Sequence, residues 1–290
     1  MKRTVGVAFV IIMCCALLAA CGSGGSSGDA LGKPVIAVSI VPEESFVKAV
    51  CGDLVETVVM VPPGSSPENY EPTPMEMQKF SDAEVFFSIG VPTEANIMPS
   101  VSENTKVVSL DAACAAVYDD LTLGDERDPH IWLSPKRVIV MVNAIAAEMS
   151  GLYPENADIF SANAKEFIDR IEEADAEIRA VLDKIECKKF IVFHPAFGYL
   201  ADDYGLEMFA LEEEGKEATA AHMQEMIDLA KDEGIKVIFY QAEIDSRQSA
   251  AFAEELGGVT AKLEPLSGNY IENLKIMANT LAEAMSKYDA

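Results

Sequence analysis

The segment Glu155–Ile185, ENADIFSANAKEFIDRIEEADAEIRAVLDKI, decides how this chain is organised. Its apolar residues recur at intervals of three and four, which places them in one stripe on a helix. They are Phe160, Ala164, Phe167, Ile171, Ala174, Ile178 and Leu182. At a rise of about 1.5 Å per residue the helix runs for roughly 45 Å, long enough to follow a pair of domains. Pro154 suits its first turn. The segment predicts a stiff helix that joins two lobes.

On both sides of this helix, short β-rich runs alternate with helical patterns. Before it, we expect strands at Pro34–Ile40, Val55–Val61, Glu84–Gly90 and Lys106–Leu110, with a helix near Glu43–Cys51. After it, we expect strands at Lys189–Phe193, Met208–Leu211, Lys236–Tyr240 and Val259–Leu263, and helices near Thr219–Glu233, Arg247–Leu256 and Tyr270–Lys287. Such alternation is typical of parallel sheets covered by helices.

The predicted fold class is therefore α/β, with two lobes that each contain a mostly parallel sheet and flanking helices, joined by one long rigid helix. The expected boundaries are 33–150 for the amino-terminal lobe, 151–187 for the linking helix and 188–290 for the carboxy-terminal lobe. No sequence repeat relates the two lobes.

The first twenty residues have the pattern of a secretory signal peptide. Lys2 and Arg3 precede an apolar run, Val5–Ala20, that is shorter than the roughly 20 apolar residues a membrane helix needs. The run ends in Leu-Ala-Ala-Cys21, which resembles a bacterial lipobox, so we expect cleavage after residue 20 and a lipid on Cys21. Residues 21–32 are rich in Gly and Ser and are expected to form a flexible tether. An uncleaved membrane anchor is the alternative.

The composition narrows the class of partner. Asp and Glu number 48 against 22 Lys and Arg, a net charge of −26. An acidic chain repels phosphate backbones, which excludes nucleic acid as a partner and favours cations, although a solvated acidic surface explains most of the charge. Of the cysteines beyond the tether, Cys51, Cys114 and Cys187 are far apart and form no CxxC pair, which argues against a thiolate zinc cluster. The sequence is compatible with one disulfide between two of these cysteines and equally with buried free thiols.

The chain has three histidines. His130 lies in the loop before a helix, and Asp128 is close enough to orient its ring. His194 ends a predicted strand, and ligands bind at the carboxyl ends of strands in open α/β sheets. From spacing alone each is either a metal ligand or a structural histidine. His222 lies at the edge of the apolar stripe of a helix and is interpreted as a boundary residue.

Four segments resemble the zinc/manganese-type substrate-binding proteins of bacterial ABC importers. They are Pro63–Pro74 (PGSSPENYEPTP), Asp128–Pro135 (DPHIWLSP), His194–Tyr199 (HPAFGY) running on to Leu206, and Leu263–Leu266 (LEPL) followed by Gly268 and Tyr270. The resemblance covers nearly the whole chain after the tether, in the family's order. It implies one metal site in the cleft between the lobes, with ligands at positions 68, 130, 194 and 264.

The implied ligands are Glu68, His130, His194 and Glu264. The family usually has histidine where this chain has Glu68, so the set contains two imidazoles and two carboxylates. Zinc accepts this set, and carboxylate-rich sites also suit manganese and ferrous iron. The residues flanking the two histidines resemble the zinc branch, and we expect Zn²⁺, with Mn²⁺ or Fe²⁺ as the alternative. The alternative is that Glu68 is an exposed loop carboxylate that does not bind the metal. Water or another group would then complete the site.

Two further features accompany this site. Asp128 and Glu243 are expected to support the ligands from behind, and Glu243 is also a spare ligand by the same resemblance. Many zinc members carry a His-rich loop before the second ligand, whereas residues 118–127 are acidic here. This segment is interpreted as a solvated charge run rather than a collector of cations.

The expected function is capture of a divalent transition metal outside the cytoplasm and its delivery to the permease of an ABC importer. We expect a monomer, held at the membrane by lipidated Cys21, and no enzymatic activity. The rival is a secreted metallohydrolase, which needs an open coordination position and a general base; the sequence has no HExxH and no nucleophile elbow. An adhesin or a metallochaperone is a third reading.

Overall fold

The computed structural model describes residues 32–212, 216–244 and 247–287. The expected signal peptide, Cys21 and all but the last residue of the 21–32 tether lie outside the described residues. Within the described segments, none of the helices combines the length and apolar composition that a membrane crossing requires.

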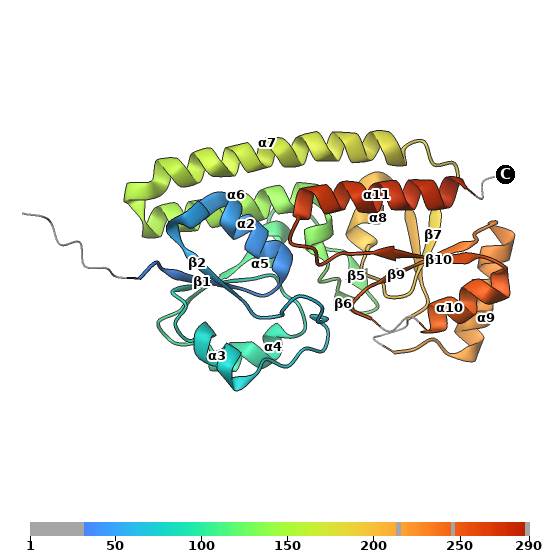
Figure 1. Ribbon diagram of the computed structural model, residues 1–290, viewed down its shortest axis with the longest axis horizontal. Coiled ribbons are helices and arrows are strands. Elements are labelled where there is room, and N and C mark those ends of the chain that lie inside the picture. Colours follow the sequence, from blue (N-terminus) through green and yellow to red (C-terminus); the bar gives the residue numbers. More distant parts are fainter. Residues whose placement is uncertain (1–31, 213–215, 245–246, 288–290) are drawn as a thin grey trace, which may run out of the picture. The chain divides into compact units, whose positions relative to one another are not determined.

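Two four-stranded parallel sheets form the two lobes (Figure 1). The N-lobe sheet has the order β2-β1-β3-β4, with β1 at Val35–Val38, β2 at Glu56–Val59, β3 at Val85–Ser88 and β4 at Lys106–Ser109. The C-lobe sheet has the order β10-β9-β7-β8, with β7 at Lys189–Val192, β8 at Glu207–Ala210, β9 at Val237–Gln241 and β10 at Val259–Leu263. Both sheets therefore follow one scheme, in which the first and third strands of the lobe are central neighbours. The predicted α/β fold is confirmed.

The long helix α7 (Ala157–Leu182) runs beside both lobes (Figure 1). It packs against α2 (Val41–Cys51) and α6 (Pro135–Leu152) of the N-lobe and against α11 (Tyr270–Ser286), which follows the C-lobe sheet. All seven residues of the stripe predicted from the sequence are buried. The linking helix is thus confirmed, and Pro154–Asn156 forms a separate 3-10 turn before it.

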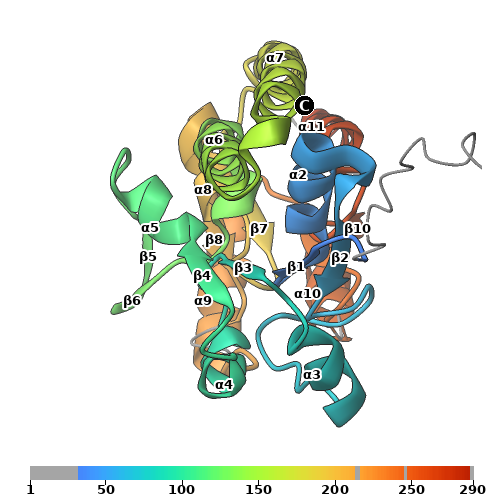
Figure 2. The same cartoon turned by 90° about the vertical axis from the view of Figure 1, so that its left-hand side faces the viewer.

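Shorter helices cover the other faces and ends of the sheets. In Figure 2, α2 and α6 lie between α7 and the N-lobe sheet, whereas α3 (Pro74–Phe80) and α4 (Glu94–Ile97) lie on the opposite side. The C-lobe carries α9 (Ala220–Asp232) and α10 (Arg247–Leu256), which pack together, and α8 (Gly198–Tyr204) beside β8. Helix α5 (Leu110–Ala115) follows β4.

One hydrophobic core joins the two lobes on the α7 side of the sheets. It contains residues of both sheets together with the α7 stripe, and smaller cores lie under α3 and α4 and under α9 and α10. Trp132, 1% exposed, lies at the junction. Its indole Nε1 donates to the carbonyl of Pro265 at 2.9 Å, and its own carbonyl accepts from the Tyr270 hydroxyl at 2.8 Å. The lobes are therefore fixed against each other by packing as well as by the helix.

The acidic residues of segment 118–127 are exposed, as expected of a solvated charge run, and the segment also forms regular structure. Strands β5 (Thr122–Leu123) and β6 (Glu126–Arg127) form a small antiparallel hairpin in it. Arg127 makes an ion pair of 3.0 Å with Asp111 of α5. The hairpin is thus tied to the N-lobe directly before Asp128 and His130.

Candidate metal centre

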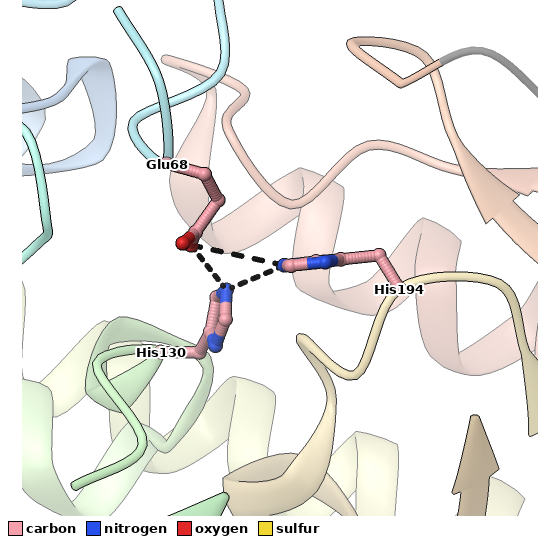
Figure 3. Close-up of side chains that lie close together, drawn as sticks. All are labelled: Glu68, His130 and His194. Carbon is pink, nitrogen blue, oxygen red and sulfur yellow. Dashed lines mark hydrogen bonds and ion pairs between the residues drawn. The ribbon is translucent and has the colours of Figure 1, made fainter. Parts of the chain in front are cut away.

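Glu68 lies in the loop that connects β2 to α3. The loop turns tightly at this point, since the backbone N–H groups of Asn69 and Tyr70 both donate to the carbonyl of Ser66. The Glu68 N–H reaches the Ser66 hydroxyl at 3.3 Å. The turn directs the Glu68 side chain, 29% exposed, toward the two histidines (Figure 3).

His130 is buried in the loop before α6, and Asp128 fixes its ring. The Asp128 carboxylate accepts from the backbone N–H of His130 at 2.9 Å and lies 2.7 Å from Nδ1 of the imidazole. With Nδ1 held by this carboxylate, Nε2 is the ring nitrogen left to bind a metal, and it faces Glu68. Residue 128 therefore sets both the backbone position and the ring orientation of residue 130.

His194 follows β7, a central strand of the C-lobe sheet, and is also buried. Its Nδ1 lies 2.9 Å from the carboxylate of Glu212, which follows the neighbouring strand β8. The sequence analysis missed Glu212. Its position directly after a predicted strand is a signal that would have pointed to it, because carboxyl ends of parallel strands meet at one edge of the sheet.

These three side chains converge on one point from three separate segments (Figure 3). The two Nε2 atoms are 3.2 Å apart, and the Glu68 Oε1 atom lies 3.5 Å from Nε2 of His130 and 3.7 Å from that of His194. A tetrahedral zinc ion with bonds of about 2.0–2.1 Å spaces its ligand atoms roughly 3.3–3.4 Å apart. The triangle therefore has the dimensions of one face of a tetrahedral zinc site.

Neighbouring charges shift the pKa values of His130 and Glu68. Burial alone acts to lower the pKa of His130, but the hydrogen bonds and charges of Asp128 and Glu68 outweigh it and raise the pKa to about 9. Burial acts to raise the pKa of Glu68, whereas the hydrogen bond to His130 and the charges of both histidines hold it below its usual value. A proton on His130 thus balances the carboxylates in the metal-free protein, and a metal ion would take its place.

The three residues line a small cavity, and Glu243 also lines it. Its volume is about 10 Å³, the space of one water molecule or one ion. Oxygen Oε2 of Glu243 is buried and has no hydrogen-bond partner among the described residues. Burial and the neighbouring charge of Glu264 raise the pKa of Glu243. Glu243 therefore lines the cavity beside the triangle, although it is not one of the three residues whose donor atoms lie within 4.8 Å of one another.

Glu264 does not join the other three residues that the family resemblance implies. Its side chain is 48% exposed and forms a short ion pair with Lys262. It follows β10, an edge strand, whereas His194 follows β7, and β9 lies between the two strands. Glu243, which follows β9, is one strand closer to His194. The order of the strands thus favours Glu243 over Glu264 as the nearer carboxylate.

The remaining candidates lie elsewhere. His222 donates its Nε2–H to the carbonyl of Ala210 at 2.9 Å and so connects α9 to β8. Cys51 and Cys114 are buried free thiols, and burial raises the pKa of each to about 12, which keeps them protonated. Cys187, half-buried, is also free.

The sequence and the fold have clear relatives among known proteins. The family model for the periplasmic component A of zinc-uptake complexes matches residues 36–284. The high-affinity zinc uptake system protein ZnuA of Bacillus subtilis is 29% identical over 281 residues, covering 90% of this chain and 88% of that protein. A zinc-bound deletion mutant of ZnuA is 33% identical, with a TM-score of 0.82, over 88% of this chain and 98% of the other.

A longer relative is also similar. The zinc-binding lipoprotein AdcA of Streptococcus pneumoniae is 27% identical over 293 residues, which cover 95% of this chain but 58% of AdcA. The chain therefore spans little more than half the length of that relative.

Proposed function

Because the chain belongs to the family of the periplasmic component A of zinc-uptake complexes, we propose that it captures a zinc ion outside the cytoplasm and delivers it to the permease of an ABC importer. The observation that carries the proposal is the triangle of Glu68, His130 and His194, whose donor atoms all lie within 4.8 Å of one another. The zinc-uptake protein of Bacillus subtilis and zinc-bound ZnuA support zinc as the cargo.

The ligands we propose are Glu68, His130 and His194. For the fourth position we propose Glu243, which lines the adjoining cavity, or a water molecule. Glu264, the fourth ligand implied by family resemblance, would reach the metal only after its ion pair with Lys262 opens. Two imidazoles with a carboxylate suit zinc, and a shell with more oxygen atoms would suit manganese or ferrous iron. Zinc is therefore the proposed cargo and manganese the alternative.

We further propose that the metal is cargo rather than a catalyst. The cavity beside the triangle has room for about one water molecule, which leaves little space for a substrate to approach a metal-bound water. Its neighbouring carboxylate, Glu243, has a raised pKa and belongs to the coordination rather than to a hydrolytic base in this proposal. Capture and release of the ion are the whole activity.

The anchoring proposal rests on the sequence. A lipid on Cys21 would hold a monomeric binding domain at the membrane, and AdcA of Streptococcus pneumoniae is itself named a lipoprotein. Cys21→Ala should release the domain from membranes without changing its affinity for zinc. Retention of this variant in the membrane fraction, with residues 1–20 still attached, would reject lipidation.

Metal binding by the full set of histidine variants tests the function directly. Protein purified without added metal should hold one zinc ion per chain, and zinc should outcompete manganese. His130→Ala and His194→Ala should each weaken zinc binding by several kcal/mol. His222→Ala is the matched control and should bind like the parent. Equal losses from all three variants would place the site elsewhere, and zinc import that does not depend on the protein would refute the transport role.

A further inference from the structure

The loop that carries Glu68 is fastened to its lobe one residue away from the ligand. The carbonyl of Pro67 accepts two hydrogen bonds from Thr93, one from its backbone N–H at 3.0 Å and one from its hydroxyl at 2.5 Å. Thr93 is 1% exposed. The other backbone hydrogen bonds that residues 62–70 make within the described part of the chain join residues of the same loop. Thr93 is therefore the fixed point of the loop beside Glu68.

Thr93 is itself held rigidly by the next residue. The buried carboxylate of Glu94 accepts from the backbone N–H of Ile89 at 2.8 Å and from that of Gly90 at 2.9 Å. It also accepts from the Ser39 hydroxyl at 2.5 Å. Ile89 follows β3 and Ser39 follows β1, which are the two central strands of the N-lobe sheet. Hydrogen bonds hold the Glu94 side chain to the ends of the two central strands, a peptide bond joins Glu94 to Thr93, and the two hydrogen bonds of Thr93 then hold Pro67.

The three ligand positions differ in how they are held. His130 and His194 each have a carboxylate on Nδ1, at 2.7 and 2.9 Å, that fixes the ring. Among the residues that the structure describes, no second carboxylate holds the Glu68 side chain from behind, and its Oε1 atom faces the two histidines. Its position depends on the backbone that carries it. A zinc site needs its ligand atoms within about 0.2 Å of the ideal distances, so the placement of this backbone matters for affinity.

We propose that Thr93 is a positioning residue for the oxygen ligand of the metal site. By binding the Pro67 carbonyl twice, it sets the backbone of Glu68 at the distance from which the carboxylate completes the triangle with His130 and His194. The inference rests on the proposed metal-binding function. A purely structural role, in which Thr93 stabilises the lobe and leaves the site unaffected, is the competing explanation.

The test separates these explanations with paired variants. Thr93→Val keeps the shape and the backbone N–H but removes the hydroxyl donor, whereas Thr93→Ser keeps the donor. Loss of one positioning hydrogen bond should weaken zinc binding about tenfold in Thr93→Val, and Thr93→Ser should bind within about twofold of the parent. Zinc affinity is measured by competition with a chelator at fixed pH, and folding by the melting temperature of the metal-free protein.

A matched control and a double mutant make the result specific. Thr105 also donates its hydroxyl to a buried backbone carbonyl of the N-lobe, that of Ala83 at 2.8 Å. Thr105→Val should therefore lower the melting temperature to a similar degree and leave zinc affinity unchanged. In a Glu68→Ala background, Thr93→Val should cost no further affinity, because the ligand that Thr93 positions is gone. The absorption spectrum of the cobalt-substituted protein should change in Thr93→Val and not in Thr105→Val.

Each outcome decides between the explanations. Parent-like affinity in folded Thr93→Val, or an equal loss with and without Glu68, would overturn the positioning role. Thr93→Ala replaces the valine variant if that variant does not fold. Failure of this inference differs from failure of the proposed function: in the first case His130→Ala still loses zinc binding, and in the second it binds zinc like the parent.

Discussion

Of the three proposed ligands, Glu68 is the one that offers an oxygen atom, so it is the position at which we expect metal preference to be changed. Glu68→His replaces its carboxylate with an imidazole, which zinc accepts readily and from which manganese gains less. We expect the zinc-to-manganese affinity ratio to rise about tenfold, or about 1.4 kcal/mol. Titration calorimetry of both metals at one pH measures this ratio.

Glu71→Ala is the control for this prediction, since Glu71 is a carboxylate of the same loop outside the triangle. Glu68→Ala should weaken both metals, and Glu71→Ala should weaken neither. Parent-like binding by Glu68→Ala would reduce Glu68 to a loop carboxylate and would leave the site to the histidines and Glu243.

His130 makes metal binding and folding respond to pH in opposite directions. Its pKa of about 9 in the metal-free protein exceeds the value of an unfolded histidine. A raised histidine pKa stabilises the fold fully below about pH 6.5, and this contribution is lost as the pH rises toward 9. Zinc needs the same nitrogen unprotonated, so its apparent affinity should fall as the pH decreases, approaching about tenfold per pH unit.

Melting of the chelator-treated protein and zinc competition, both measured between pH 6 and 9, check this coupling. Asp128→Asn removes the charge that raises the pKa of His130 and should move both transitions to lower pH. An affinity that stays constant over this range would argue against a histidine ligand.

Among the individual elements, α7 contributes to the stability of the fold through its stripe of buried residues. Ile171 of this stripe is 1% exposed and belongs to the core that the two lobes share. Ile171→Ala leaves a cavity there and should reduce the free energy of unfolding by about 2–5 kcal/mol. Ile159 on the same helix is 47% exposed, and Ile159→Ala should change the stability by less than about 0.5 kcal/mol.

Denaturant unfolding of the two isoleucine variants compares them directly. Zinc affinity should stay at the parent value in both, because neither residue contacts the site. A similar cost for the two substitutions would mean that the α7 stripe does not contribute to the core as the structure shows.

At the scale of the whole molecule, the two lobes should unfold together. They share one hydrophobic core, and the side chain of Trp132 binds the backbone of the C-lobe segment at Pro265. Trp132 is the only tryptophan of the chain, so its fluorescence reports the junction, whereas far-ultraviolet circular dichroism reports all helices. The two signals should follow one transition in denaturant. Separate midpoints would show that the lobes are independent domains.

The core that the two lobes share also limits how the protein can release its metal. With the lobes joined by the core and by α7, the segments best placed to move are the loops that carry the ligands. Among the described residues, the backbone hydrogen bonds of the Glu68 loop lie within the loop apart from the one from Thr93 to Pro67, and Glu264 is exposed and paired with Lys262. Exchange of the metal is therefore expected to involve local changes in these loops rather than separation of the lobes.

Local features of the fold could be predicted from the amino-acid sequence. The seven stripe residues of α7 predicted its helix because a helix places positions three and four apart on one face. His130 and Asp128 are two residues apart, so their contact follows from the local chain. Alternating strands and helices predicted two parallel sheets, and the segments around His130 and His194 indicated the family. These features depend on neighbours along the chain, which is why they are readable without coordinates.

Which carboxylates lie next to the histidines depends on contacts between segments that are distant in the sequence. Glu212 reaches His194 because β8 pairs with β7, and Glu243 lies nearer than Glu264 because β9 separates β10 from β7. Thr93 holds Pro67 across 26 residues of sequence. Strand order and loop anchoring come from hydrogen bonds and packing between segments far apart in the chain, and no local pattern of residues specifies them.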